Sequence, residues 1–225
     1  MPKEFFEPCS HSGPCQKGKC GCIERSTYCE LSCGCVLCNN LKYCSCASCD
    51  GACACIRANR ECSELCICAK NNKNNKTDNC GNRNISHRKQ LELSICPSQK
   101  HGYGLYSECF IGEGSYVIEY TGEIISDKEA ERRGNFYEMN RCSYLFNLAS
   151  RGGNCLYSVD AFFCGNKSRY INHSRTKANL RAEVLLKDGM QKIVFYATQY
   201  IYNGTELLFD YHFSEDHKRE HGIID

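Results

Sequence analysis

The sequence predicts an α+β protein in which a β-rich body follows an irregular, cysteine-rich head. Two observations predict this division. Seventeen of the 22 cysteines lie between Cys9 and Cys80. After about Arg88 the chain consists of short β-branched or aromatic segments bounded by turn residues, as is typical of strands. With 225 residues, of which 42% are hydrophobic, the chain has room for one or two domains and a real core.

Composition also narrows the class of protein. Residues 1–7 contain no apolar stretch of the kind found in a signal peptide, and nowhere do roughly 18 apolar residues run together. The interpretation is a soluble, intracellular chain without a membrane partner. In a reducing compartment, such dense cysteine indicates metal ligands rather than disulfides.

The head contains an internal repeat. The unit Cys-x-Cys, six residues, Cys, three residues, Cys-x-Cys occurs at residues 20–35 and again, with identical spacing, at residues 53–68. Closely spaced thiolates of this kind converge on shared metal centres. The sequence therefore predicts a twofold metal module.

The number of ligands suggests a stoichiometry. Three tetrahedral zinc ions need about twelve ligand positions, which about nine residues supply if three thiolates each bridge two metals. The head offers two such sets, and so about six zinc ions. His11 would be a terminal ligand, because an imidazole presents one nitrogen to a metal; a solvated histidine is the alternative. The partition between the sets stays open, above all for Cys80. The first set is Cys9, His11, Cys15, Cys20, Cys22, Cys29, Cys33, Cys35 and Cys38, and the second is Cys44, Cys46, Cys49, Cys53, Cys55, Cys62, Cys66, Cys68 and Cys80.

Residues 71–87 are predicted to be a linker, since the stretch from Asn71 to Asn79 has no apolar residue. In the body, Asp188-Gly189 predicts a hairpin turn. One helix is predicted to open at Ser126, with Glu129 completing a capping box, and to run toward Phe136. The predicted strands are residues 91–95, 116–120, 144–148, 182–186, 193–197 and 207–211.

Four motifs in the body are weak when taken singly. They are His101-Gly102-Tyr103-Gly104, Tyr120-Thr121-Gly122-Glu123-Ile124-Ile125, Arg169-Tyr170-Ile171-Asn172-His173-Ser174 and Glu206-Leu207-Leu208-Phe209-Asp210-Tyr211. The first has two glycines and no long helix after it, so it is not a dinucleotide-binding fingerprint. An isolated Asn-His-Ser is usually an ordinary loop, and an isolated Leu-Leu-Phe-Asp-Tyr is usually a half-buried strand.

Together, the order and spacing of these motifs resemble a SET domain, the fold of protein-lysine methyltransferases. The head resembles the CXC module of the Enhancer of zeste family, the catalytic subunit of a polycomb repressive complex. The resemblance implies a CXC module in residues 1–70 with Cys80 as a late ligand, and a SET domain in residues 88–214. It also implies a knot-like crossing that brings Asn-His-Ser beside Phe-Asp-Tyr, and a tail, residues 215–225, that covers the cofactor.

The resemblance implies roles for individual residues. The expected cofactor is S-adenosylmethionine, in addition to zinc. The residues expected to bind it are His101, Gly102, Tyr103, Gly104, Arg169, Asn172, His173 and Tyr211. Tyr211 is the expected active-site tyrosine. The expected channel for the target lysine is formed by Tyr144, Phe146, Phe209 and Asn140.

The chain departs from the family pattern at Asn140, where a channel tyrosine is usual. The shorter side chain there, and Phe209 rather than a tyrosine, leave room for more than one methyl group. We therefore expect di- or trimethylation. No cysteine follows Cys164, so we expect no zinc-binding post-SET segment of the kind found in other histone methyltransferases, which favours the polycomb branch.

The function that the resemblance implies is methylation of lysine 27 of histone H3 in the nucleus, with nucleosomes and polycomb subunits as partners. A weak DNA contact by the head would need a local patch such as Lys70, Lys73 and Lys76, because the zinc-loaded head is slightly acidic overall. One alternative is a zinc-dependent chromatin- or DNA-binding module with a degenerate SET body, which the retained Gly102 and Tyr211 argue against. Another is methylation of a different protein lysine.

Overall fold

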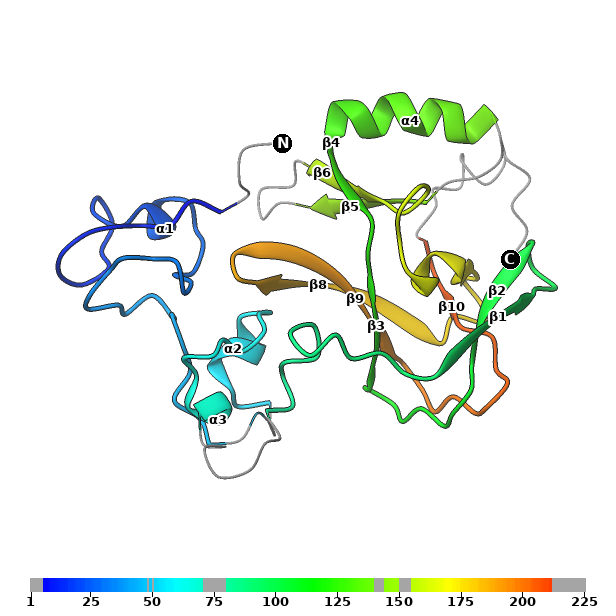
Figure 1. Cartoon of the computed structure of the whole chain (residues 1–225), viewed down its shortest axis with the longest axis horizontal. Coiled ribbons are helices and arrows are strands. Elements are labelled where there is room, and N and C mark those ends of the chain that lie inside the picture. Colours follow the sequence, from blue (N-terminus) through cyan, green and yellow to red (C-terminus); the bar gives the residue numbers. More distant parts are fainter. Residues whose placement is uncertain are drawn as a thin grey trace. The chain divides into compact units, whose positions relative to one another are not determined.

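The computed structural model describes residues 6–47, 49, 51–70, 80–139, 144–149 and 155–211 (Figure 1). It divides into two compact units. The cysteine-rich unit comprises Met1–Arg88 and Val184–Lys192, and the body comprises Lys89–Glu183 and Ile193–Asp225. Within the described ranges, no helix combines the length and the apolar character that crossing a membrane requires.

The cysteine-rich unit has little regular structure. Its helices α1 (Gly21–Glu24), α2 (Ala54–Arg57) and α3 (Ile67–Lys70) are four residues long. α1 and α2 follow Cys20 and Cys53, which occupy the same place in the two copies of the repeat. Such short helices are not stable alone, because nucleating a helix costs more free energy than the hydrogen bonds of a single turn supply. The buried residues of all three are cysteines, so the thiols take the place of an apolar core.

Residues 80–87 pack within the cysteine-rich unit, which differs from the linker expected over residues 71–87. The thiol of Cys80 is buried among other thiols. The Asn82 side chain donates hydrogen bonds to the Arg60 carbonyl at 2.9 Å and to Cys62 Sγ at 3.4 Å. Ser86 Oγ donates to Glu61 Oε2 at 2.6 Å. These contacts are made by polar groups, so the polar composition of the segment did not indicate them. Residues 71–79 lie outside the described ranges.

A buried ion pair joins the two copies of the repeat. Arg60, in the second copy, donates to Glu30 Oε2 of the first at 2.8 Å, and their side chains are only 1% and 3% exposed. The guanidinium also donates to the carbonyls of Cys29 and Leu41. Burial raises the pKa of Glu30 to about 7, against the opposing effect of Arg60. Both charges are therefore removed from water, and each is stable in the interior only while the other is present.

The described residues of the body form three sheets (Figure 1). The first pairs β1 (Leu93–Pro97) with β2 (Tyr103–Ser107). The second has the order β3-β9-β8-β10-β7, and the third has the order β4-β6-β5. The strands of these two sheets are β3 (Tyr116–Tyr120), β9 (Met190–Ala197), β8 (Leu180–Lys187), β10 (Leu208–Phe209), β7 (Asn172–His173), β4 (Glu123–Ser126), β6 (Cys155–Asp160) and β5 (Leu145–Ala149).

Local sequence explains several of these elements. β3 coincides with a predicted strand, and Val117 and Ile118 on it pack into the core with Val194 and Phe195 of β9. The helix α4 (Asp127–Met139) begins as predicted, with the Glu129 backbone N–H donating to Ser126 Oγ at 3.3 Å. The turn between β8 and β9 at Asp188 and Gly189 has φ of 50° and 79°, as the predicted hairpin requires.

The C-terminal strand completes the fold. β10 runs parallel to both of its neighbours and lies between β8 and β7, with Leu208 opposite Asn172 and Phe209 opposite His173. The buried side chain of Asn179 fixes it: Asn179 Oδ1 accepts from Leu208 N at 2.9 Å, and its Nδ2 donates to the Glu206 carbonyl at 2.8 Å. The predicted fold class is confirmed, including the crossing that brings the two motifs together.

The buried pair gives a stability prediction. Arg60→Ala leaves the Glu30 carboxylate buried without its counter-charge, which should lower the free energy of unfolding of the zinc-loaded protein by about 3 kcal/mol. The measurement is chemical denaturation followed by circular dichroism at pH 8. Arg57→Ala, at an exposed position three residues earlier, is the control and should change stability little. Equal stability of the two variants would contradict the role assigned to the pair.

Candidate active site and metal centre

The candidate active site is centred on β10 and the two residues that follow it. The Phe209 ring stacks on Phe146 of β5 with centroids 5.9 Å apart and packs edge-on against Phe195 at 4.9 Å. The Tyr211 ring lies 4.5 Å from the Phe209 ring, and the Tyr120 ring lies 5.5 Å from the Phe146 ring, measured between centroids. Strands distant in sequence thus contribute one aromatic wall that includes the predicted residues Phe146, Phe209 and Tyr211.

Two tyrosine hydroxyls in this wall donate to backbone carbonyls. Tyr211 Oη donates to the Ile171 carbonyl at 2.6 Å, and Tyr120 Oη donates to the Tyr144 carbonyl at 2.7 Å. Burial raises the pKa of Tyr211, and the nearby phenol of Tyr144 raises it further. Burial also raises the pKa of Tyr120, with Tyr211 as the next cause. Both phenols are therefore neutral at physiological pH.

Tyr120 was overlooked as a site residue, although it opens one of the motifs. Its position at the end of β3 would have suggested a core tyrosine. The predicted residue Tyr144 contributes its carbonyl to the contact with Tyr120, while its ring packs toward Phe162 at 5.8 Å. Asn140, the remaining predicted channel residue, lies outside the described ranges.

The Asn-His segment lies beside Tyr211, as its parallel pairing with β10 requires. The Tyr211 backbone N–H donates to His173 Nδ1 at 3.1 Å, and the two rings have centroids 5.2 Å apart. Asn172 Nδ2 donates to the carbonyls of Tyr103 at 3.1 Å and His101 at 3.3 Å. The structure therefore brings together the predicted turn at residues 101–104, Asn172, His173 and Tyr211.

The two glycines of that turn meet different requirements. Gly102 has φ of +50°, which favours glycine, with open space where a side chain would begin. At Gly104, a Cβ atom would overlap the Glu206 carboxylate. Glu206 thus lies against the predicted turn, a position that the sequence did not indicate, although the residue begins the C-terminal motif.

Arg169, which was expected to bind the cofactor, lies against the loop after β6. Its guanidinium donates to the carbonyls of Ala161 and Phe162 at 3.3 and 3.2 Å. A charged network holds the same region from the other side: Tyr137 Oη and Arg133 Nη1 each donate to Asp160 Oδ2 at 2.7 Å. Burial, followed by the contact with Asp160, raises the pKa of Tyr137 to about 12. These contacts fix the end of the three-stranded sheet that carries Phe146.

The first set of predicted metal ligands is clustered in the cysteine-rich unit. Its sulfur and imidazole atoms form overlapping groups in which Cys9, Cys29 and Cys35 each belong to two, as bridging ligands would. Cys20 Sγ lies 3.9 Å from Cys29 Sγ. His11 Nδ1 is buried and has no hydrogen-bond partner among the described residues, which suits a ligand atom. The groups are Cys9, Cys22, Cys29 and Cys33; Cys15, Cys29, Cys35 and Cys38; and Cys9, His11 and Cys35.

The second set has the same form. Cys62 belongs to two groups of four thiols, and Cys46 Sγ lies 3.2 Å from Cys44 Sγ and 3.5 Å from Cys53 Sγ. The groups are Cys44, Cys55, Cys62 and Cys66, and Cys49, Cys62, Cys68 and Cys80. The partition left open by the sequence is therefore given by the structure: Cys38 lies with the first set, and Cys44 and Cys80 lie with the second.

The spacing of the thiols fits zinc. Zinc–sulfur bonds of about 2.3 Å in a tetrahedron separate the sulfurs by about 3.8 Å. The Cys9–Cys29 and Cys15–Cys38 sulfur atoms are 3.7 Å apart, and Cys55 and Cys66 are 3.9 Å apart. The cysteines are free thiols rather than disulfides. The donor set therefore suits zinc, which would cross-link segments that have little apolar core of their own.

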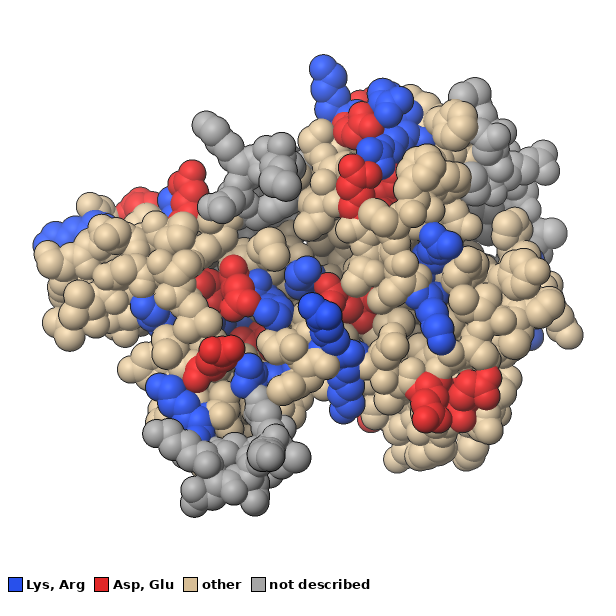
Figure 2. All heavy atoms as spheres, viewed as in Figure 1, with Lys and Arg blue, Asp and Glu red and all other residues tan. Residues whose placement is uncertain are grey.

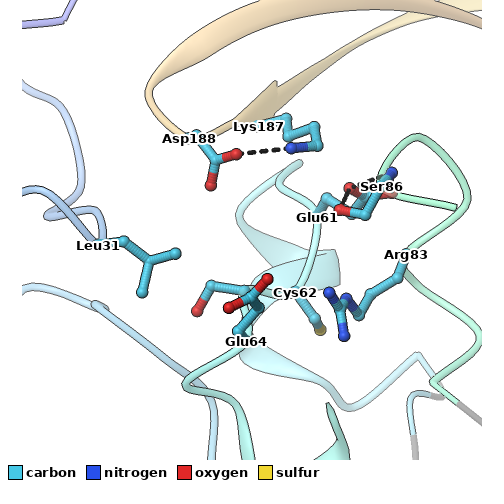
Figure 3. A pocket seen from close by; sticks show the side chains of 9 residues that line it. Leu31, Glu61, Cys62, Glu64, Arg83, Ser86, Lys187 and Asp188 are labelled. Carbon is cyan, nitrogen blue, oxygen red and sulfur yellow. Dashed lines mark hydrogen bonds and ion pairs between the residues drawn. The ribbon is translucent and has the colours of Figure 1, made fainter. Parts of the chain in front are cut away.

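A polar pocket lies beside the second set (Figure 3). Its wall includes Glu61, hydrogen-bonded to Ser86, and Lys187, paired with Asp188 at 2.6 Å. Burial raises the pKa of Glu61. None of the residues expected to bind the cofactor or the target lysine lines this pocket.

Comparison with known proteins shows which protein family the chain resembles. The SET domain family model matches residues 102–212, and the chain carries a SET domain. The chain is 33% identical over 221 residues to the histone-lysine N-methyltransferase mes-2 of Caenorhabditis elegans, covering 93% of this chain and 28% of that protein. It is 32% identical over 232 residues to the histone-lysine N-methyltransferase CLF of Arabidopsis thaliana, covering 96% and 25%.

Solved structures give the same result. An active polycomb repressive complex 2 in the basal state contains a chain that is 33% identical, with a TM-score of 0.75, covering 96% of this chain and 31% of that one. The Chaetomium thermophilum complex bound to S-adenosylmethionine gives 34% identity and a TM-score of 0.75, covering 93% and 29%. The chain belongs to the Enhancer of zeste family of SET-domain proteins. It spans about a quarter to a third of the length of these relatives.

The shared thiols give a test of the metal centre. The purified chain should contain about six zinc ions. Cys62→Ser removes a thiol that belongs to two groups and should release at least about two of them, while the first set stays loaded. Metal analysis by inductively coupled plasma mass spectrometry measures both. Cys109→Ser, outside the head, is the control. A wild-type content of about two zinc ions or fewer would contradict two multi-zinc clusters.

Proposed function

We propose that this chain is the catalytic part of a histone-lysine N-methyltransferase that uses S-adenosylmethionine. The observation that supports this most strongly is the junction of Tyr211, His173 and Asn172 beside the aromatic wall. The relatives that share this chain's motifs are described as histone-lysine N-methyltransferases. Together they suggest two adjoining subsites, one for the methyl donor and one for a lysine side chain.

The proposed cofactor subsite consists of the turn at residues 101–104, Asn172 and His173. When bound, S-adenosylmethionine would supply an electrophilic methyl group. The turn offers backbone groups at an open glycine, Gly102, and Asn172 ties that turn to β7. A fixed arrangement of this kind favours transfer because it removes the orientational freedom of the two reactants.

The aromatic wall suits a lysine that must lose its proton before it attacks. A free lysine has a pKa of about 10.4, and an apolar environment disfavours its charged form. Phe146 and Phe209 provide that environment. The same ring faces attract a methylated ammonium by cation–π contact, so a partly methylated product can stay for another round.

Tyr211 is proposed to orient the methyl group. Its hydroxyl proton is used in the hydrogen bond to the Ile171 carbonyl, so the oxygen has lone pairs left that can only accept. Weak C–H···O contacts from a polarised methyl suit such an acceptor. Because the buried phenol stays neutral, it can do this without acting as a base.

The narrower proposal concerns substrate and setting. We propose lysine 27 of histone H3 as the target, polycomb subunits as partners and the nucleus as the location. One relative of known structure, 34% identical with a TM-score of 0.75, is a polycomb repressive complex 2 described in complex with H3K27me3 and H3K27M. The proposed domains are a CXC module in residues 1–70 with Cys80 as a late ligand, a linker over residues 71–87 whose last part packs against that module, a SET domain in residues 88–214, and a cofactor-covering tail in residues 215–225. A weak DNA contact by the head would involve Lys70.

Removal of the Tyr211 hydroxyl tests the mechanism. Tyr211→Phe should lower kcat/KM at least about tenfold, because the substitution keeps the ring and removes the acceptor oxygen. The assay follows methyl transfer to H3 peptides and nucleosomes by the chain reconstituted with polycomb subunits. Tyr202→Phe, at an exposed position, is the control.

Unchanged activity of Tyr211→Phe would contradict the mechanism. DNA binding without any turnover by the wild-type chain would favour the zinc-dependent binding module. Transfer to another lysine would replace the proposed target and leave the chemistry intact.

The degree of methylation tests the role of Phe209. The wild-type chain should give di- and trimethyl-lysine, whereas Phe209→Tyr should shift the product toward monomethyl-lysine. The added hydroxyl would take up space beside Phe146 and Tyr211. Mass spectrometry of the product peptide measures the distribution. A wild-type reaction that stops at one methyl group would contradict the expectation.

A further inference from the structure

Glu206 lies where three segments of the body meet. Its backbone pairs with Tyr106 of β2 in an antiparallel bridge, and the next residue donates from its N–H to the Leu105 carbonyl at 2.7 Å. The Glu206 carbonyl accepts from Asn179 at 2.8 Å. The backbone is therefore fixed from both sides, and the side chain has a defined place from which to act.

The carboxylate is surrounded by donors. Glu206 Oε1 accepts from Ser98 Oγ at 2.6 Å and from Asn172 Nδ2 at 3.0 Å, and Oε2 accepts from Tyr106 Oη at 3.3 Å. The space beside it is kept open by Gly104, where a Cβ atom would overlap Oε1. Ser98, Gly104 and Tyr106 all belong to the β1–β2 hairpin or its turn. The carboxylate thus links this hairpin to Asn172 on β7.

This contact determines which way the Asn172 amide faces. An ionised carboxylate only accepts hydrogen bonds, and so do the carbonyls of His101 and Tyr103. All three accept from Nδ2, so the amide nitrogen is held toward the turn and the oxygen is directed away from it. Without the carboxylate, only the carbonyls of Tyr103 and His101, at 3.1 and 3.3 Å from Asn172 Nδ2, would favour this orientation of the amide.

We propose that Glu206 is a positioning residue of the cofactor subsite, which fixes the Asn172 amide and the turn at residues 101–104 for S-adenosylmethionine. The inference rests on the proposed function and adds to it a residue whose hydrogen bonds go to the β1–β2 hairpin and to Asn172. It predicts that Glu206 affects cofactor affinity much more than the rate of the chemical step.

The test uses Glu206→Gln in the chain reconstituted with its polycomb subunits. The substituted amide is similar in size but carries donors of its own, so it no longer enforces the Asn172 orientation. We expect the Kd and the KM for S-adenosylmethionine to rise about tenfold, while kcat stays within about twofold of wild type. Isothermal titration calorimetry and steady-state kinetics measure the two effects. Glu108→Gln, at an exposed position next to β2, is the control.

Two further variants separate positioning from general stability. Gly104→Ala pushes against the carboxylate and should weaken cofactor binding in the same way. In a double-mutant cycle, Glu206→Gln should add little to Asn172→Ala, because Glu206 acts through Asn172. Additive effects, or unchanged cofactor affinity of Glu206→Gln, would overturn the inference. If wild type itself binds no S-adenosylmethionine, the proposed function fails, which is a distinct result.

Discussion

The insertion of β10 between β8 and β7 is the constraint on which the site depends. Parallel pairing on both sides places Phe209 opposite His173 and Leu180, so the residues that follow emerge beside the Asn-His segment. The strand is only two residues long, and its ladder bonds alone would hold it weakly. Asn179 compensates by bonding both Leu208 and Glu206. One buried amide therefore determines the register of the segment that carries Phe209 and Tyr211.

The cysteine-rich unit is held together by buried thiols and an ion pair rather than by hydrogen-bonded strands. Its regular elements are too short to bury much apolar surface, and its interior consists mostly of thiols, together with the buried ion pair between Arg60 and Glu30. With zinc as the ligand, folding and metal binding would be the same process, because the crowded sulfurs would come together only when a cation neutralises them. The Arg60 guanidinium links the copies through backbone carbonyls and Glu30, so the two clusters need not act as independent modules.

The sequence was informative where local chemistry decides the structure. Repeated Cys-x-Cys spacing predicted two thiol clusters, β-branched residues predicted β3, and Ser126 with Glu129 predicted the start of α4. Prediction from the sequence failed where contacts between residues distant in the chain determine the local structure. The ladder that makes a strand of Asn172–His173 comes from β10, some 35 residues later, and no local pattern specifies it. Residues 80–87 looked like a linker because hydrogen bonds, rather than apolar side chains, bind them to Glu61 and Cys62.

The Gly-Tyr-Gly motif indicated where two glycines are needed, but not why each of them is needed. The resemblance assigned both glycines to one role, binding of the cofactor. Only Gly102 has a backbone conformation that favours glycine, and it borders open space. Gly104 is small because a carboxylate from the other end of the body occupies the adjoining volume. The two motifs at residues 101–104 and 206–211 are therefore one structural unit, in which a glycine in the first makes room for the side chain that begins the second.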